Sequence, residues 1–100
     1  MKRLPPLPAL HTFVITAQCC NFTRAAEQLC ITQGAVSRQI AGLEDHLGYS
    51  LFHRQARGLS LTEQGQALYP RIEQAFDLIG EAIEYASIRR TPLQIKAPTC

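Results

Sequence analysis

Apolar residues recur at helical spacing in the first half of the chain and predict three helices there. The first, over residues 9–20, has a stripe of four apolar side chains, Leu10, Phe13, Val14 and Ala17. The second, over residues 24–29, is short, and either Asn21 or Thr23 can cap it. The third, over residues 33–47, follows the capping residue Thr32 and ends at Gly48, which suits the left-handed backbone after a helix.

A different pattern follows the third helix. Residues 50–54 and 58–61 predict two short strands, which Gln55, Ala56 and Arg57 join into a hairpin. A long fourth helix opens at Thr62 and Glu63, and Pro70 falls inside it, where a proline usually produces a kink. The tail over residues 93–97 alternates like a strand, and we expect it to be the first strand of a further domain.

The fourth helix carries an apolar seam whose members are spaced 4, 3, 4, 3 and 4 residues apart, with one further isoleucine beside it. These residues are Leu68, Ile72, Ala75, Ile79, Ala82, Ile83 and Ala86. Such a stripe can pair with a second chain, but it more often packs in the core of its own chain. The spacing alone leaves both interpretations open.

Composition predicts one globular domain. The chain has 100 residues, of which 46% are hydrophobic and 18% are charged, which is neither a disordered composition nor enough length for two cores. No apolar run approaches the ~18 residues that a membrane-spanning helix needs. Prolines follow Lys2 and Arg3, so no signal peptide is recognisable, and we expect a cytoplasmic protein without a membrane partner.

Charge is distributed unevenly along the chain. The formal net charge is only +2, but residues 1–60 hold six basic and three acidic side chains, whereas residues 61–100 hold four basic and five acidic ones. A basic first half followed by a slightly acidic tail fits a module that binds a polyanion. Many domains with such an imbalance bind nothing charged, so this observation needs a second one.

Side chains that could carry catalysis or bind a metal are scattered. The cysteines, Cys19, Cys20, Cys30 and Cys100, form no CxxC pair and have no histidine at a finger-like spacing, so we expect no zinc site. The three histidines lack a nucleophilic partner at a credible spacing. We therefore expect neither an enzyme nor a cofactor.

The order of the predicted elements is that of a helix-turn-helix followed by a wing. A short helix, a turn of three residues and a longer helix place Val36 and Ile40 between the two helices and leave one face of the longer helix free. That face carries Gln33, Ser37 and Arg38, which suit base edges of DNA, with Gly34 beside them. Thr23 or Arg24, at the start of the shorter helix, could hold a phosphate.

Each of these features has an ordinary interpretation when it stands alone. Gln33, Ser37 and Arg38 could form a solvated helix face, and Arg54 and Arg57 could be exposed charges on a hairpin. The complete order within 90 residues, with a polar-faced helix between a short helix and a basic hairpin, favours nucleic-acid binding.

Five sequence segments then resemble the N-terminus of LysR-type transcriptional regulators. They are residues 22–29 (FTRAAEQL), 31–40 (ITQGAVSRQI), 43–48 (LEDHLG), 51–54 (LFHR) and 58–65 (GLSLTEQG). Residues 4–10 and the Leu68-Tyr69-Pro70 run are similar to the branch that contains glycine-cleavage activators and β-lactamase regulators. The resemblance extends over residues 4 to about 97.

This resemblance implies a mainly α fold, in which a winged helix-turn-helix domain over residues 4–62 precedes a linker and dimerisation helix over residues 63–90. The helix-turn-helix itself would span about residues 22–41, and residues 91–100 would begin a truncated effector-binding domain, whose missing remainder would bind a small-molecule inducer. The implied partners are double-stranded DNA, bound at an interrupted palindrome, and a second copy of the chain.

The resemblance also implies roles for single residues. Base or phosphate contacts of the recognition helix fall to Gln33, Gly34, Ser37 and Arg38, although Gly34 stands where Ser or Pro is more usual. Arg57 would reach the minor groove from the wing. The expected phosphate contacts are Thr23, Arg24, Gln39 and Arg54. A second hypothesis is a dimerisation module that forms mixed dimers through residues 62–90 and binds no DNA itself.

Overall fold

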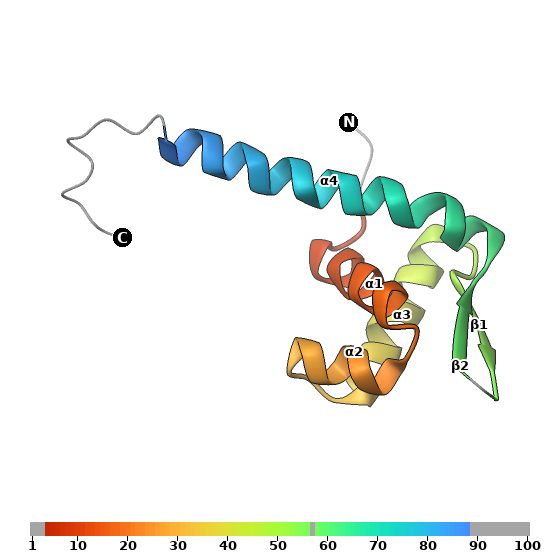
Figure 1. Cartoon of the computed structure of the whole chain (residues 1–100). Helices are drawn as coiled ribbons and strands as arrows, with labels where there is room; N and C mark the ends of the chain where they lie inside the picture. The colour runs from red at the N-terminus through yellow and green to blue at the C-terminus, as the bar shows by residue number, and fades with distance from the viewer. Residues whose placement is uncertain (1–3, 57, 89–100) are drawn as a thin grey trace.

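The computed structural model describes residues 4–56 and 58–88 and is mainly helical in that part (Figure 1). Three helices, α1 (Leu7–Cys19), α2 (Phe22–Leu29) and α3 (Gln33–Leu47), precede an antiparallel hairpin and a long helix, α4 (Glu63–Ile88). The hairpin consists of β1 (Phe52–Gln55) and β2 (Gly58–Leu61). The predicted fold class, a winged helix-turn-helix followed by a long helix, is confirmed.

The helix ends follow from their capping residues. The side chain of Asn21 accepts a hydrogen bond from the backbone N–H of Arg24, so α2 starts at Phe22, two residues before the predicted start. Thr32 caps α3 in the same way through the N–H of Ala35, and Gly48, with φ of 87°, ends it, both as predicted. α1 begins two residues earlier than predicted, with Pro8 in its first turn.

The first strand of the wing begins two residues later than predicted, because Leu51 bonds to other elements. Its N–H donates to the carboxylate of Glu44 in α3, and its carbonyl accepts from the N–H of Thr62 just before α4. The ladder therefore starts at Phe52, which pairs with Leu61, while Arg54 pairs with Leu59. The second strand has the predicted bounds.

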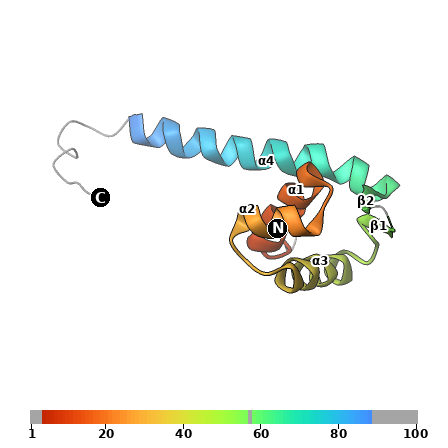
Figure 2. The same ribbon diagram turned by 60° about the horizontal axis from the view of Figure 1, so that its bottom comes forward.

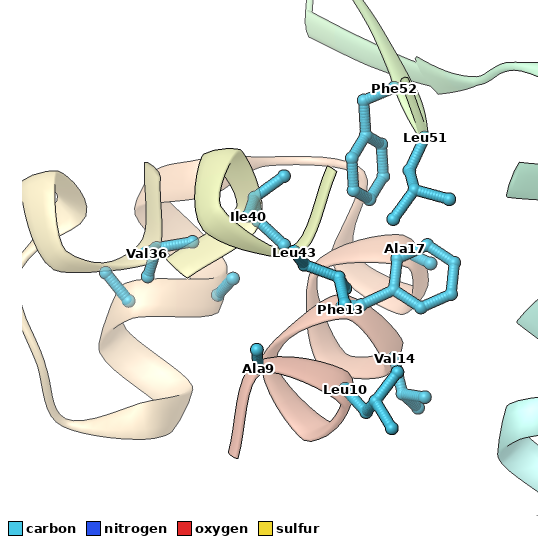
Figure 3. Packing of buried hydrophobic residues seen from close by; sticks show 12 residues of the cluster. Ala9, Leu10, Phe13, Val14, Ala17, Val36, Ile40, Leu43, Leu51 and Phe52 are labelled. Atoms are coloured by element: carbon cyan, nitrogen blue, oxygen red, sulfur yellow. The ribbon is translucent and has the colours of Figure 1, made fainter. Parts of the chain in front are cut away.

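The hydrophobic core lies between α1, α3 and the start of the wing (Figure 3). Its largest fully buried apolar side chains are Phe13, Ile40, Leu43, Leu51 and Val36. Ala25 and Ala26 of α2 are buried too, and their small size lets the short helix approach the other two closely. The core thus fixes α2 and α3 to α1.

Helix α4 lies across α1 and reaches the hairpin at its first turn. The hydroxyl of Thr62 donates to the carbonyl of Ser50 at 2.8 Å and accepts from the N–H of Gly65 at 3.0 Å, which caps the helix. The helix then continues through Pro70 to Ile88. Glu73 of α4 accepts a hydrogen bond from Gln18 of α1 at 3.2 Å and, within α4, one from Tyr69 at 3.0 Å.

Tyr69 lies in the α1–α4 contact, edge-on to the Phe13 ring. Partial burial, together with the neighbouring Glu73 carboxylate, raises the pKa of the Tyr69 phenol. The phenol donates a hydrogen bond to Glu73. His11 of α1 adds an edge contact to the Phe76 ring, with 5.8 Å between ring centroids.

The apolar seam of α4 is divided between two environments. Leu68 and Ile72 are half buried and pack against the domain's own core. The other residues of the seam are exposed, namely Ala75, Ile79, Ala82, Ile83 and Ala86. Intramolecular packing therefore uses the first part of the seam and leaves the rest on the surface.

Helix α4 and the first turns of α3 lie on opposite sides of the domain. α4 runs along one side, whereas the first turns of α3 and the tip of the wing lie on the other side of the domain (Figures 1 and 2). None of the described helices is long and apolar enough to cross a membrane. Arg57, the end of the linker helix predicted over 63–90 and the tail over 91–100, including its predicted strand at 93–97, lie outside the described residues.

We predict that Gly65→Ala destabilises the fold. A Cβ at position 65 would overlap the carbonyl oxygen of Leu51 and lie 2.9 Å from Cδ2 of Leu61, and backbone is costly to displace. The expected loss in the free energy of unfolding, measured by urea denaturation, is ~1–3 kcal/mol.

Gly80→Ala is the matched control, because a Cβ at position 80 meets nothing within 4 Å. It should stabilise the helix by ~0.5–1 kcal/mol. Equal stability of Gly65→Ala and the parent chain would contradict the close approach of α4 to Leu51.

Candidate nucleic-acid interface

The outer face of α3 is free of intramolecular packing at its N-terminal end. Val36, Ile40 and Leu43 point into the core, which turns Gln33, Gly34 and Arg38 to the surface, where all three are exposed. A Cβ at Gly34 would have no neighbour closer than the Thr32 hydroxyl at 4.0 Å, so a ligand can approach the backbone there. With 15 residues the helix is ~22 Å long, enough for its first turns to enter a major groove.

Two other predicted residues of α3 are partly covered. Ser37 and Gln39 are both half buried. The Gln39 side-chain carbonyl accepts a hydrogen bond from the hydroxyl of Thr12, which is buried in α1. Gln39 therefore also links α3 to α1, a structural role that the sequence pattern does not indicate.

The start of α2 lies beside the start of α3. The hydroxyl of Thr23 donates to the side-chain carbonyl of Gln33 at 3.4 Å, and both residues are exposed. Arg24 is exposed as well, but it borders a different hollow, with Cys19, Glu27 and Gln28. Of the two candidate phosphate ligands on α2, Thr23 is thus the one that contacts Gln33 on α3.

A cleft of about 270 Å³ joins the start of α2, the start of α3 and the wing. Sequence analysis had singled out three of its lining residues, Thr23, Gln33 and Arg54. It had missed the others, Asn21, Phe22, Gln55, Ala56, Gly58 and Leu59. The sequence predicts the hairpin that carries the last four of these residues. It does not predict that the hairpin lies against α2, and so it does not predict the cleft.

Aromatic contacts hold the wing beside α2. The guanidinium carbon of Arg54 lies 5.2 Å from the centroid of the Phe22 ring. Phe22 also meets Phe52 of β1 edge-on, at 6.4 Å between centroids. The contacts bring Arg54 to the same cleft as Thr23, which is 31 residues away in the sequence, and Gln33, which is 21 residues away.

A carboxylate of α3 fixes the root of the wing. One oxygen of Glu44 accepts from the backbone N–H of Leu51 at 2.7 Å and from that of Phe52 at 3.3 Å. Hydrogen bonds to an ionised acceptor are among the stronger ones. These hydrogen bonds therefore fix the position of the wing relative to α3. A binding surface formed by α3 and the wing together requires such a fixed position.

The arrangement is suited to a polyanion. Arg38 of α3 and Arg54 of the wing are exposed cations, and Arg54 lines the same cleft as Gln33. Among residues 4–56 and 58–88 there is no group of three or more His, Cys, Asp or Glu side chains that could hold a metal ion.

Comparisons with known proteins agree with this geometry. Residues 7–66 match the profile of the bacterial regulatory helix-turn-helix proteins of the lysR family. The chain is 53% identical over 81 residues to the glycine cleavage system transcriptional activator of Escherichia coli K12, and 48% identical over 79 residues to the transcriptional activator AmpR of Pseudomonas aeruginosa. These alignments cover 81% and 79% of the chain but only 27% of either relative.

A solved structure has the same fold. The crystal structure of a complex between BenM_DBD and benA site 1 DNA superposes with a TM-score of 0.80 at 31% identity. The match covers 83% of this chain and 93% of that chain. The present chain thus corresponds to nearly the whole of that DNA-bound domain, and to about a quarter of the length of the curated relatives.

We predict that Glu44→Ala loosens the wing. The substitution leaves the N–H groups of Leu51 and Phe52 without their acceptor, which should lower the free energy of unfolding by ~1–3 kcal/mol. Amide hydrogen exchange at these two positions should accelerate. The exposed neighbour Asp45 provides the control, since Asp45→Ala should change stability by no more than about 0.5 kcal/mol. Unchanged exchange at Leu51 in Glu44→Ala would refute the anchoring role.

Proposed function

The chain belongs to the LysR family of bacterial regulatory helix-turn-helix proteins, and we propose that it is the sequence-specific DNA-binding part of a transcriptional regulator. It would act as a homodimer on double-stranded DNA in the bacterial cytoplasm, without enzymatic activity. Because the chain spans 27% of its curated relatives, a small-molecule inducer would bind in a part of the regulator that this chain does not include.

One observation carries the proposal: the first turns of α3 are exposed beside the wing, on the side of the domain away from α4 (Figure 1). A helix that enters a major groove must present polar side chains without obstruction, and a wing beside it can follow the neighbouring backbone. Both conditions hold for the surface formed by Gln33, Gly34, Arg38 and Arg54.

We assign roles to these residues from their chemistry. Arg38 fits the paired acceptors of guanine, and Gln33 fits adenine. Gly34 permits close approach of the DNA backbone, and Ser37 lies half buried beside this group. Thr23 and Arg54 would bind phosphates at the cleft, Arg24 and Gln39 would be peripheral phosphate contacts, and Arg57 would extend from the wing tip to the minor groove.

The exposed part of the α4 seam supports dimerisation. Ala75, Ile79, Ala82, Ile83 and Ala86 form an apolar stripe over three turns, and Leu78 beside it is 64% exposed. A monomer would leave this surface in water, whereas pairing with a second α4 would bury it. Two recognition helices, one from each copy, would then meet successive major grooves of an interrupted palindrome.

The same stripe favours a second candidate, a dimerisation module that forms mixed dimers and binds no DNA itself. The two candidates differ in their response to DNA. Analytical ultracentrifugation of the chain, with and without a duplex selected from a random-sequence pool, should show a dimer–DNA complex if the proposal holds. A dimer that ignores every duplex would support the second candidate.

We predict that Arg38→Ala weakens binding to the selected duplex by ~1–3 kcal/mol and relaxes sequence preference at one position of each half-site. Fluorescence anisotropy at fixed salt measures the affinity, because phosphate contacts make it strongly salt-dependent. Arg71→Ala, on the exposed surface of α4, removes the same charge away from α3 and serves as the control. Equal affinities of Arg38→Ala and Arg71→Ala would contradict the assigned contact.

We predict that Ile79→Asp dissociates the dimer. The substitution places a charge in the centre of the exposed seam, where burial without a partner is unfavourable. Sedimentation should show a monomer at concentrations where the parent chain is a dimer, with helical content retained. Glu81→Gln, on the opposite face of α4, should leave the dimer intact. A dimeric Ile79→Asp variant would remove this seam from the interface.

A further inference from the structure

Arg54 occupies a position in the wing that packing alone would give to an apolar residue. Side chains alternate across a strand, so Arg54 shares a face of the hairpin with Phe52 and with the partners of these two residues, Leu61 and Leu59. Phe52 is buried, and both leucines are half buried against the core. Arg54 is thus the charged member of the inward face, although it remains exposed.

The Phe22 ring provides the surface on which that charge rests. It is half buried and lies 5.2 Å from the guanidinium carbon of Arg54. Phe22 contacts Phe52 edge-on, and Phe52 contacts the fully buried Phe13 in the same way, at 5.7 Å between centroids. A continuous series of rings therefore connects the core of α1 to the arginine of the wing.

The contact has a consequence for ligand binding. A free arginine side chain samples many rotamers, and ordering it on binding costs conformational entropy. A guanidinium held against an aromatic face is already ordered and still has its N–H donors for an anion. Here the guanidinium lies at the edge of the cleft that Thr23 and Gln33 also line.

We propose that Phe22 is a positioning residue, whose ring orders Arg54 at the cleft so that the guanidinium binds a phosphodiester of the DNA backbone. This inference rests on the proposed DNA-binding function. The inference goes beyond that function, because it gives an apolar residue of α2 control over a phosphate contact that the wing makes. Phe22 itself touches no DNA in this scheme.

The first test needs no DNA. Protons that lie over the face of an aromatic ring are shielded, so the side-chain resonances of Arg54 in the parent chain should be shifted upfield in NMR spectra. The shift should disappear in Phe22→Leu, which keeps an apolar side chain without a ring, and persist in Phe22→Tyr, which keeps the ring. Random-coil positions for Arg54 in the parent chain would overturn the proposal before any variant is made.

The second test measures the salt dependence of binding to a mixed-sequence B-DNA duplex. Loss of one phosphate contact should reduce the slope of log Kobs against log salt concentration by about 0.9. Arg54→Ala and Phe22→Leu should each show this reduction, and the double variant should show no more than Arg54→Ala alone. Leu29→Ala, which also truncates a half-buried residue of α2, should keep the parent slope.

The outcomes separate this inference from the function on which it rests. A parent slope in Phe22→Leu with a reduced slope in Arg54→Ala would overturn the positioning role and leave DNA binding intact. A parent slope in Arg54→Ala would overturn the phosphate contact. A parent chain that binds no duplex, while Arg54 still shows its upfield shift, would overturn the DNA-binding proposal and leave only the ring contact.

Discussion

The backbone of Leu51 is the point on which the arrangement of the elements depends. Its N–H donates to Glu44 of α3, its carbonyl accepts from Thr62 at the start of α4, and its side chain is fully buried. The absence of a side chain at Gly65 lets α4 approach this carbonyl. One residue between the helix-turn-helix and the wing thereby fixes three elements, and the orientation of the wing relative to α3 follows from it.

Local signals in the sequence were sufficient for α3 and for the hairpin, but insufficient for the residue at which the wing begins. A capping threonine, a 4-3-4 apolar stripe and a terminal glycine define residues 33–47 without any tertiary information. The start of β1 could not be predicted from the sequence. Leu51 has the apolar character of a strand residue, but its N–H bonds to Glu44 of α3 and its carbonyl to the N–H of Thr62 before α4. The prediction for the seam of α4 is limited in the same way. Its spacing does not indicate that Leu68 and Ile72 pack against the core of their own domain.

The candidate site shows the same division. Gln33, Gly34 and Arg38 could be predicted because helical periodicity alone turns them away from the core. The cleft could not, since it brings Thr23 and Gln33 together with Arg54 through aromatic packing between segments distant in the sequence. Gln39 lies on the same helix as these predicted DNA contacts, yet its hydrogen bond to Thr12 also connects α3 to α1. Periodicity identifies a face, and tertiary contacts decide what each residue on it does.

The contact between α1 and α4 has a geometric consequence for a dimeric regulator. There a hydrogen bond from Gln18 to Glu73 joins the two helices, beside ring contacts that pair Phe13 with Tyr69 and His11 with Phe76. Ile88 lies ~22 Å beyond Glu73 along the helix, so tilting the helix by ~10° about this contact would displace its far end by ~4 Å. A small change in how α1 packs against α4 would therefore set how far apart two paired domains stand.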